Sequence, residues 1–216
     1  MGKEILRDWQ KATIEYVFAQ PDAAHFYLSG GTALAAYYLN HRASDDLDFF
    51  SEQDFPTTTV QRIAGGLRTV LNADGLRYSR LHDRRQFFFT HDGEELKVEF
   101  TRYPFRQLEP VRQSGTALVD GEFDIAVNKL MTITDRFDPK DFVDLYFLLP
   151  KYRLPRLRDG VAEKFGVRLD PVFLGSELMK VNRVSALPKM ILPLSIEDLK
   201  EFFSQQAETL RAEVLE

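Results

Sequence analysis

The chain has 216 residues, of which 44% are hydrophobic, and a formal net charge of -5. This length is enough for one good core and a second small one, so we expect a globular, soluble protein. The lack of cysteine excludes disulfides, thiolate catalysis and Cys-ligated zinc, and the negative charge argues against non-specific coating of nucleic acid. We see no apolar run near the roughly 18 residues of a membrane span and no signal-peptide pattern, so we expect a cytoplasmic protein with no membrane contact.

The first half of the chain alternates between helical and strand patterns. Helical spacing of apolar residues predicts helices at residues 4–19, Thr32–Leu39 and Thr57–Ala73. Runs rich in apolar and aromatic residues predict strands at Phe26–Leu28, Asp46–Phe50, Leu76–Leu81, Gln86–Thr90 and Leu96–Thr101. These elements together are typical of a mixed sheet with flanking helices.

The second half is helical after a connecting segment. Prolines and glycines mark residues 102–121 as a connection, which contains one further strand candidate at Thr116–Val119. The helices predicted after it are Ile125–Phe137, Pro139–Leu149, Leu157–Phe165, Pro171–Val181 and Ile196–Val214. We therefore predict an α+β fold with two domains, at about 1–120 and 121–216.

Ser29-Gly30-Gly31-Thr32 joins a predicted strand to a predicted helix. Glycines allow close approach of the backbone to a ligand, and the unsatisfied N–H groups of a helix N-terminus attract phosphate. An ordinary turn, in which Ser29 or Thr32 caps the helix, explains the same residues.

Asp46 and Asp48 lie two residues apart in a predicted strand, so both carboxylates project from one face, while Asp45 is expected to be exposed. Two anions this close repel each other unless a cation lies between them, and Mg2+ prefers such oxygen ligands. The alternative is an edge strand with solvated carboxylates that oppose aggregation.

Glu99 is a candidate third acid. It shares one strand face with Lys97 and Thr101, and it would join the aspartate pair if the two strands were neighbours. Three such acids can hold two metal ions and orient an attacking hydroxyl. A cross-strand ion pair between Glu99 and an arginine is the competing interpretation.

A fourth group of polar residues lies in the helical half. Lys129 and Arg136 are seven residues apart, share a helix face and suit a triphosphate. Asp138 followed by Pro139 predicts a helix start, which places Asp141 in the first turn as either a structural residue or a partner that positions Lys129.

The chain from Ser29 to Leu34, from His41 to Phe50 and from Lys129 to Tyr146 resembles the AbiEii/AbiGii toxin group. This group consists of minimal nucleotidyltransferases related to the DNA polymerase beta superfamily. The resemblance implies phosphate contacts at Gly30, Gly31 and Thr32, and Mg2+ ligands at Asp46 and Asp48. It also places Lys129 and Asp141 in later motifs, and Glu99 where the superfamily often has aspartate.

The implied reaction is transfer of a nucleoside monophosphate from an NTP to a hydroxyl, with Lys129 offsetting charge on the leaving group. By resemblance, the partners are a cognate antitoxin and an RNA acceptor such as tRNA. A basic stretch from Lys151 to Arg168 is a candidate RNA site, but solvated helix faces are the preferred explanation for it. Two alternatives stay open: an inactive nucleotide- or partner-binding protein, and a nucleotidyltransferase for small molecules such as aminoglycosides.

Overall fold

The computed structural model describes the backbone of residues 5–215 and the side chains of residues 5–213. The chain forms two compact units. The sheet unit contains the residues up to Tyr38 together with Ser44–Gly121, and the helical unit contains Leu39–Ala43 together with the chain from Glu122 onward. This arrangement confirms the α+β class, with a mixed sheet followed by helices.

A seven-stranded sheet runs through the sheet unit in the order β3-β4-β5-β2-β1-β7-β6. The strands are β1 (Tyr27–Ser29), β2 (Leu47–Ser51), β3 (Gly75–Leu81), β4 (Arg84–His91), β5 (Glu94–Arg102), β6 (Arg112–Ser114) and β7 (Ala117–Val119). The β2–β5 and β1–β7 pairs are parallel, and the other pairs are antiparallel. β2 therefore lies in the centre of the sheet, which excludes the edge-strand interpretation of Asp46 and Asp48.

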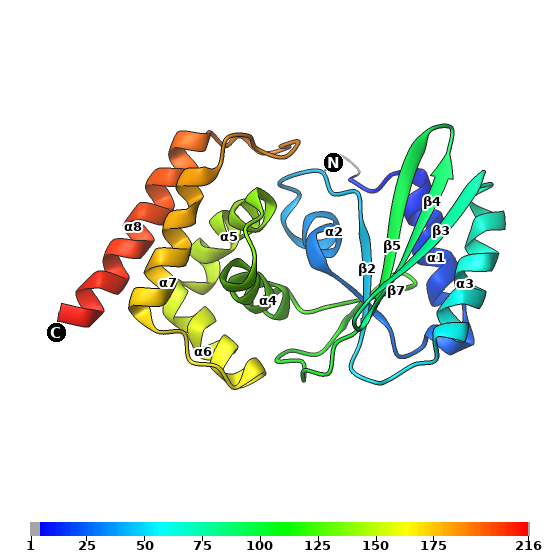
Figure 1. Cartoon of the computed structure of the whole chain (residues 1–216), viewed down its shortest axis with the longest axis horizontal. Coiled ribbons are helices and arrows are strands. Elements are labelled where there is room, and N and C mark those ends of the chain that lie inside the picture. The colour runs from blue at the N-terminus through cyan, green and yellow to red at the C-terminus, as the bar shows by residue number, and fades with distance from the viewer. Residues whose placement is uncertain (1–4, 216) are drawn as a thin grey trace. The chain divides into compact units, whose positions relative to one another are not determined.

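Within the sheet unit, helices lie on both faces of the sheet, with α1 (Asp8–Phe18) and α3 (Thr57–Val70) on one face and α2 (Gly30–Leu34) on the other (Figure 1). α1 and α3 pack on the apolar face, where Phe49 and Phe100 stack in the core. α2 follows β1 and continues as a π-helical turn, Ala35–Leu39. The alternation of side chains along β2 thus buries Leu47 and Phe49 and points Asp48 to the other face, beside α2.

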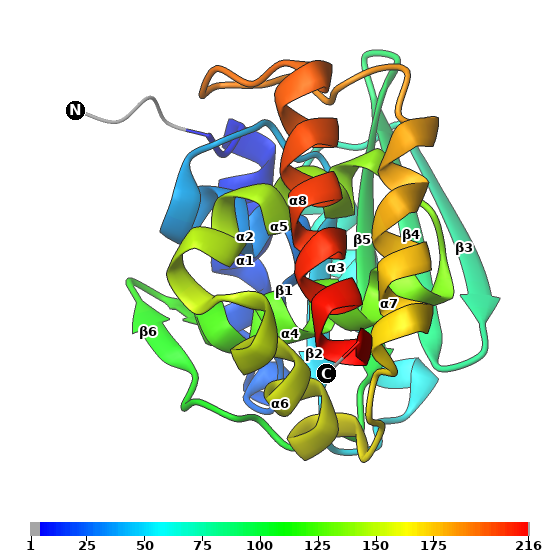
Figure 2. The same ribbon diagram turned by 90° about the vertical axis from the view of Figure 1, so that its left-hand side faces the viewer.

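The helical unit is built from α4 to α8. Their bounds are α4 (Glu122–Asp135), α5 (Pro139–Tyr152), α6 (Leu154–Phe165), α7 (Pro171–Leu178) and α8 (Ile196–Leu215), with a 3-10 turn at Met179–Arg183. α7 and α8 lie side by side (Figure 2). Asp138 caps α5 by accepting a hydrogen bond from the Lys140 backbone, and Pro139 follows it, as the sequence predicted.

The predicted bounds differ from the structure at several ends. The first helix begins at Asp8 rather than at residue 4, which lies outside the described residues. Asp46 immediately precedes β2, although it was expected inside that strand. The sequence analysis did not predict β6, because the prolines and glycines of 102–121 indicated a loop. The three residues of β6 form a strand by pairing with β7. Within residues 5–215, no helix is long and apolar enough to span a membrane.

Candidate active site

A row of polar residues crosses the sheet at the level of Asp48. Ser29 on β1 is paired with Asp48 on β2, Asp48 with Glu99 on β5, and Glu99 with Gln86 on β4. Residues directly opposite each other on neighbouring strands point to the same face. The register of β2 and β5 therefore brings Asp48 and Glu99 together, as the sequence analysis expected if the two strands were neighbours.

Lys97 supplies a positive charge to this carboxylate cluster, which comprises Asp46, Asp48 and Glu99. Its Nζ atom lies 3.1 Å from Glu99 Oε2 and 3.5 Å from Asp46 Oδ2. Burial alone would lower the pKa of Lys97, but the charges of Asp48, Glu99 and Asp46 outweigh it and raise the pKa above its ordinary value. The ammonium group therefore remains charged among three carboxylates.

Glu99 is almost fully buried and held by several donors. Gln86 Nε2 and Thr101 Oγ1 each donate a hydrogen bond of 2.9 Å to it, and Arg84 Nε lies 3.5 Å away. Burial would raise the pKa of Glu99, but the Gln86 hydrogen bond and the charges of Lys97 and Arg84 lower it overall. An ionised, hydrogen-bonded carboxylate suits a metal ligand better than a proton acceptor, because a low pKa makes a weak base.

The glycine turn lies against the aspartate of β2. Gly30 has a φ of 73°, and a Cβ atom at this position would overlap with Asp48 Oδ2. Only glycine therefore lets the turn approach Asp48 this closely. Gly31 and Thr32 follow in the first turn of α2.

Ser29 and Thr32 do not cap α2 with their side chains. The Ser29 hydroxyl donates to Asp120 Oδ2 at 2.7 Å, and the Thr32 hydroxyl donates to the backbone carbonyl of Asp46. Thr32 is fully buried. Its hydroxyl thus ties the glycine turn to the residue before β2, which the simple capping interpretation did not foresee.

Replacing Gly30 with alanine tests this close approach. We expect a loss of about 1–3 kcal/mol in the free energy of unfolding, because alanine is strained at positive φ and its methyl group displaces Asp48. Thermal and urea unfolding would measure the loss. The matched control is Gly65→Ala in α3, which meets no atom within 4 Å and should add about 0.5–1 kcal/mol. Equal stability of the Gly30 variant and the wild type would contradict the steric argument.

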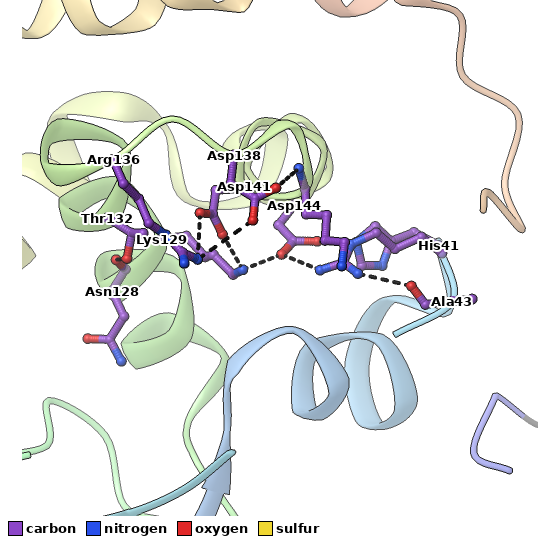
Figure 3. A network of polar contacts seen from close by, with 11 residues as sticks. His41, Ala43, Asn128, Lys129, Thr132, Arg136, Asp138, Asp141 and Asp144 are labelled. Atoms are coloured by element: carbon purple, nitrogen blue, oxygen red, sulfur yellow. Dashed lines mark hydrogen bonds and ion pairs between the residues drawn. The ribbon is translucent and has the colours of Figure 1, made fainter. Parts of the chain in front are cut away.

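A second group of charges lies wholly within the helical unit (Figure 3). Lys129 Nζ lies 2.6 Å from both Asp141 Oδ1 and Asp144 Oδ2. Arg136, just after α4, reaches Asp141 Oδ2 at 3.2 Å and is about half exposed. The structure therefore supports both interpretations of Asp141: it lies in the first turn of α5, and it is a partner of Lys129.

Asp144 is the centre of this network. Arg42 binds it through Nε at 2.6 Å and Nη2 at 2.8 Å, and His41 Nε2 lies 2.7 Å from it. Burial would raise the pKa of Asp144, but Lys129, Arg42 and His41 hold it well below the ordinary range. His41 and Arg42 are both buried against this carboxylate.

Among the described residues, Asp74, His91 and Asp92 are the group of acids and histidines whose ligand atoms all lie within 4.8 Å of one another, a spacing that Asp46, Asp48 and Glu99 do not reach. These residues lie at the ends of β3 and β4 and in the following turn, on the surface, and His91 Nδ1 contacts the Asn72 carbonyl at 2.8 Å. Nothing in the sequence pattern singled out this cluster. Only the hairpin geometry brings Asp74 beside His91 and Asp92.

Sequence reasoning placed Lys97 on the face of Glu99 but assigned it no role. Strand alternation was the available signal, since residues 97 and 99 share a face by period alone. The Arg42–Asp144 pair had no such signal, because these residues are about 100 positions apart and the segment Leu39–Ala43 joins the helical unit only in three dimensions.

Comparisons with known proteins bear on the family and the fold of this chain. A sequence model described as "Nucleotidyl transferase AbiEii toxin, Type IV TA system" matches residues 15–120, which include β1, α2, β2 and β5. An uncharacterised protein of Aquifex aeolicus is 34% identical over 151 residues, or 68% of each chain.

Solved structures share the fold. A protein of H. pylori described as a candidate nucleotidyltransferase has a TM-score of 0.63 at 19% identity, covering 96% of this chain and 95% of its own. MenT4, a nucleotidyltransferase toxin of Mycobacterium tuberculosis, has a TM-score of 0.51 at 15% identity, covering 93% and 81%. From the family match and the relative, with the fold in agreement, this chain is an enzyme of the AbiEii nucleotidyltransferase toxin family.

Proposed function

We propose that this protein transfers a nucleoside monophosphate from an NTP to an acceptor hydroxyl in a Mg2+-dependent reaction, as the toxin of a toxin–antitoxin pair. One observation carries the proposal. Three carboxylates, from Asp46, Asp48 and Glu99, gather around one cationic group on the sheet face that borders the Gly30 turn.

The carboxylate cluster has the donor chemistry that a hard divalent ion prefers, because all three side chains offer oxygen ligands. Lys97 already places one cationic group among them. Asp46 is about half exposed, so the cluster is open to a ligand from solvent. When bound there, Mg2+ would neutralise the triphosphate and lower the pKa of the attacking hydroxyl.

The proposed step is an in-line displacement at the α-phosphorus of the NTP. The acceptor oxygen bonds to this phosphorus, the bond to the β-phosphate oxygen breaks, and pyrophosphate leaves. The hydroxyl proton passes to solvent water. Asp46, Asp48 and Glu99 would hold the metal ion, and the backbone at Gly30, Gly31 and Thr32 would contact the phosphates.

Lys129, Arg136 and Asp141 have different parts in this proposal. Arg136 is about half exposed, so its guanidinium can bind a phosphate while Asp141 holds its other side. Lys129 is mostly buried between Asp141 and Asp144, which neutralise its charge. Within the helical unit, we therefore propose Arg136 as a phosphate-binding residue, with Asp141 and Lys129 positioning it.

An RNA acceptor, with tRNA as the first candidate, and a cognate antitoxin are the proposed partners. The family description as a toxin of a type IV system supports the antitoxin. The basic stretch from Lys151 to Arg168 gives less support for RNA than its sequence suggested. Lys151 pairs with Glu122, Arg158 with Glu213, and Lys164 is buried against Asp124.

A transfer assay tests the proposal. Wild-type protein with each labelled NTP, Mg2+ and total RNA should label an RNA band and release pyrophosphate, and aminoglycosides serve as alternative acceptors. Glu99→Gln should lower the turnover by about 10²-fold, as expected for the loss of one charged group that stabilises the transition state.

Glu95→Gln is the matched control, because Glu95 lies on the same face of β5 but is exposed and pairs with Arg77. It should retain wild-type turnover. Labelling of a drug alone would move the proposal to small-molecule acceptors. NTP binding without pyrophosphate release, across all four NTPs and these acceptors, would refute catalysis.

A further inference from the structure

Lys97 is the most unusual member of the carboxylate cluster. A lysine side chain that is only 22% exposed and contacts both Glu99 and Asp46 sits where the proposed function needs a metal ion. In the described sheet unit its ammonium is thus an internal counter-ion for the acids. Its charge offsets the repulsion between the neighbouring carboxylates.

An ammonium group and a divalent cation compete for these carboxylates. At separations of a few ångströms the two cations repel each other, and the burial of Glu99 limits screening of that repulsion by water. Lys97 Nζ occupies oxygens of Asp46 and Glu99 that a metal ion would use. Binding of a metal ion to these oxygens is therefore opposed by the ammonium.

The displaced side chain can stay near the cluster. Lysine has a flexible four-carbon stem and a compact charge that binds phosphate well. Lys97 lies on β5, opposite Phe88 on β4 and on the same face as Glu99. A change of side-chain rotamer can therefore move its ammonium group while the strand stays in place. The phosphates of an NTP held beside Gly30 would offer it a new anionic partner.

We infer that Lys97 is a tethered competitor of the metal ion, which a bound nucleotide draws away from the carboxylates, so that metal and nucleotide bind cooperatively. This inference rests on the proposed function. It gives Lys97 a role in the order in which metal ion and nucleotide bind. The metal ion binds weakly to the protein alone and strongly once the triphosphate is present. The coupling is reciprocal, as any linkage between two binding sites must be.

Metal binding without turnover tests the inference. Mn2+ affinity would be measured by electron paramagnetic resonance and calorimetry, with and without a non-hydrolysable NTP analogue, for wild type and Lys97→Gln. We expect Lys97→Gln to bind Mn2+ at least about tenfold more tightly without nucleotide, because the competing charge is gone. The nucleotide should raise Mn2+ affinity strongly in the wild type and much less in the variant.

Two further variants keep the result interpretable. Arg84→Gln removes the other cation near Glu99. The Arg84 side chain is about half exposed, so its loss should change Mn2+ affinity far less. Lys97→Met serves as a second neutral variant if Lys97→Gln does not fold, and Mn2+ should raise its unfolding temperature more than that of the wild type.

The outcomes separate the two proposals. If the wild type binds Mn2+ and loses it in Asp48→Asn, but Lys97→Gln binds no more tightly or keeps the full nucleotide effect, the inference about Lys97 is wrong and the metal site stands. If the wild type binds no Mn2+ even with nucleotide, both proposals fail.

Discussion

Replacing Asp48 with asparagine should lower the turnover of nucleotidyl transfer by about 10³-fold or more, because a lost metal ligand removes several kcal/mol of charge stabilisation from the transition state. Asp48 is the central acid of the polar row, paired in register with both Ser29 and Glu99. The substitution keeps the shape of the side chain beside Gly30, so the fold should change little. Turnover with labelled NTP and Mn2+ binding by calorimetry are the two measurements.

Asp45→Asn is the matched control for this experiment. Asp45 is a neighbouring aspartate that is about half exposed and pairs with Arg7 on the surface. An exposed pair of this kind contributes little to stability, and it lies outside the carboxylate cluster. Its variant should keep wild-type turnover and metal binding. Near-normal activity of Asp48→Asn, with Mn2+ binding unchanged, would place the catalytic centre elsewhere.

Replacing Asp144 with alanine should have the largest effect on stability, a loss of about 3–5 kcal/mol near neutral pH. The substitution leaves the buried charges of Arg42 and Lys129 without their shared carboxylate (Figure 3). Urea unfolding followed by circular dichroism would measure the loss. The comparison variant is Asp138→Ala, which removes a helix cap and a long, half-exposed ion pair with Arg136 and should cost about 1 kcal/mol.

The pH dependence gives an independent check on Asp144. The pKa of Asp144 is lowered in the folded protein. Its ionised carboxylate therefore contributes fully to the free energy of unfolding above the ordinary aspartate pKa, and this contribution is lost progressively as the pH falls below that value. The stability gap between wild type and Asp144→Ala should therefore be full near pH 7 and narrow below about pH 4. A gap of the same size near pH 7 and near pH 3 would show that Asp144 acts by packing and not by charge.

Local patterns predicted most of the elements that position the candidate site. Alternation along 46–50 and 96–101 placed Asp48 and Glu99 on polar faces, and Gly30 marked a tight turn between strand and helix. Asp138 and Pro139 predicted the start of α5 correctly. These signals depend on residues a few positions apart, whose geometry the backbone period alone determines.

The roles of several residues could not be predicted in this way. Lys97 was visible as a neighbour of Glu99, but its contact with Asp46 depends on the parallel pairing of β2 with β5. Thr32 looked like a helix cap, yet its hydroxyl binds the Asp46 carbonyl because the chain folds back at that point. Likewise, β6 exists only because β7 offers it a partner.

By itself, the sequence determined the α+β class, the acids and glycines of the candidate site, and the family resemblance, since each of these depends on residue type and short spacing. Tertiary structure alone decided which acids share a face, which cation lies among them, and that Arg42 is buried against Asp144. The physical reason is that strand register and long-range ion pairs join residues far apart in the chain, and these contacts form only when the whole core packs.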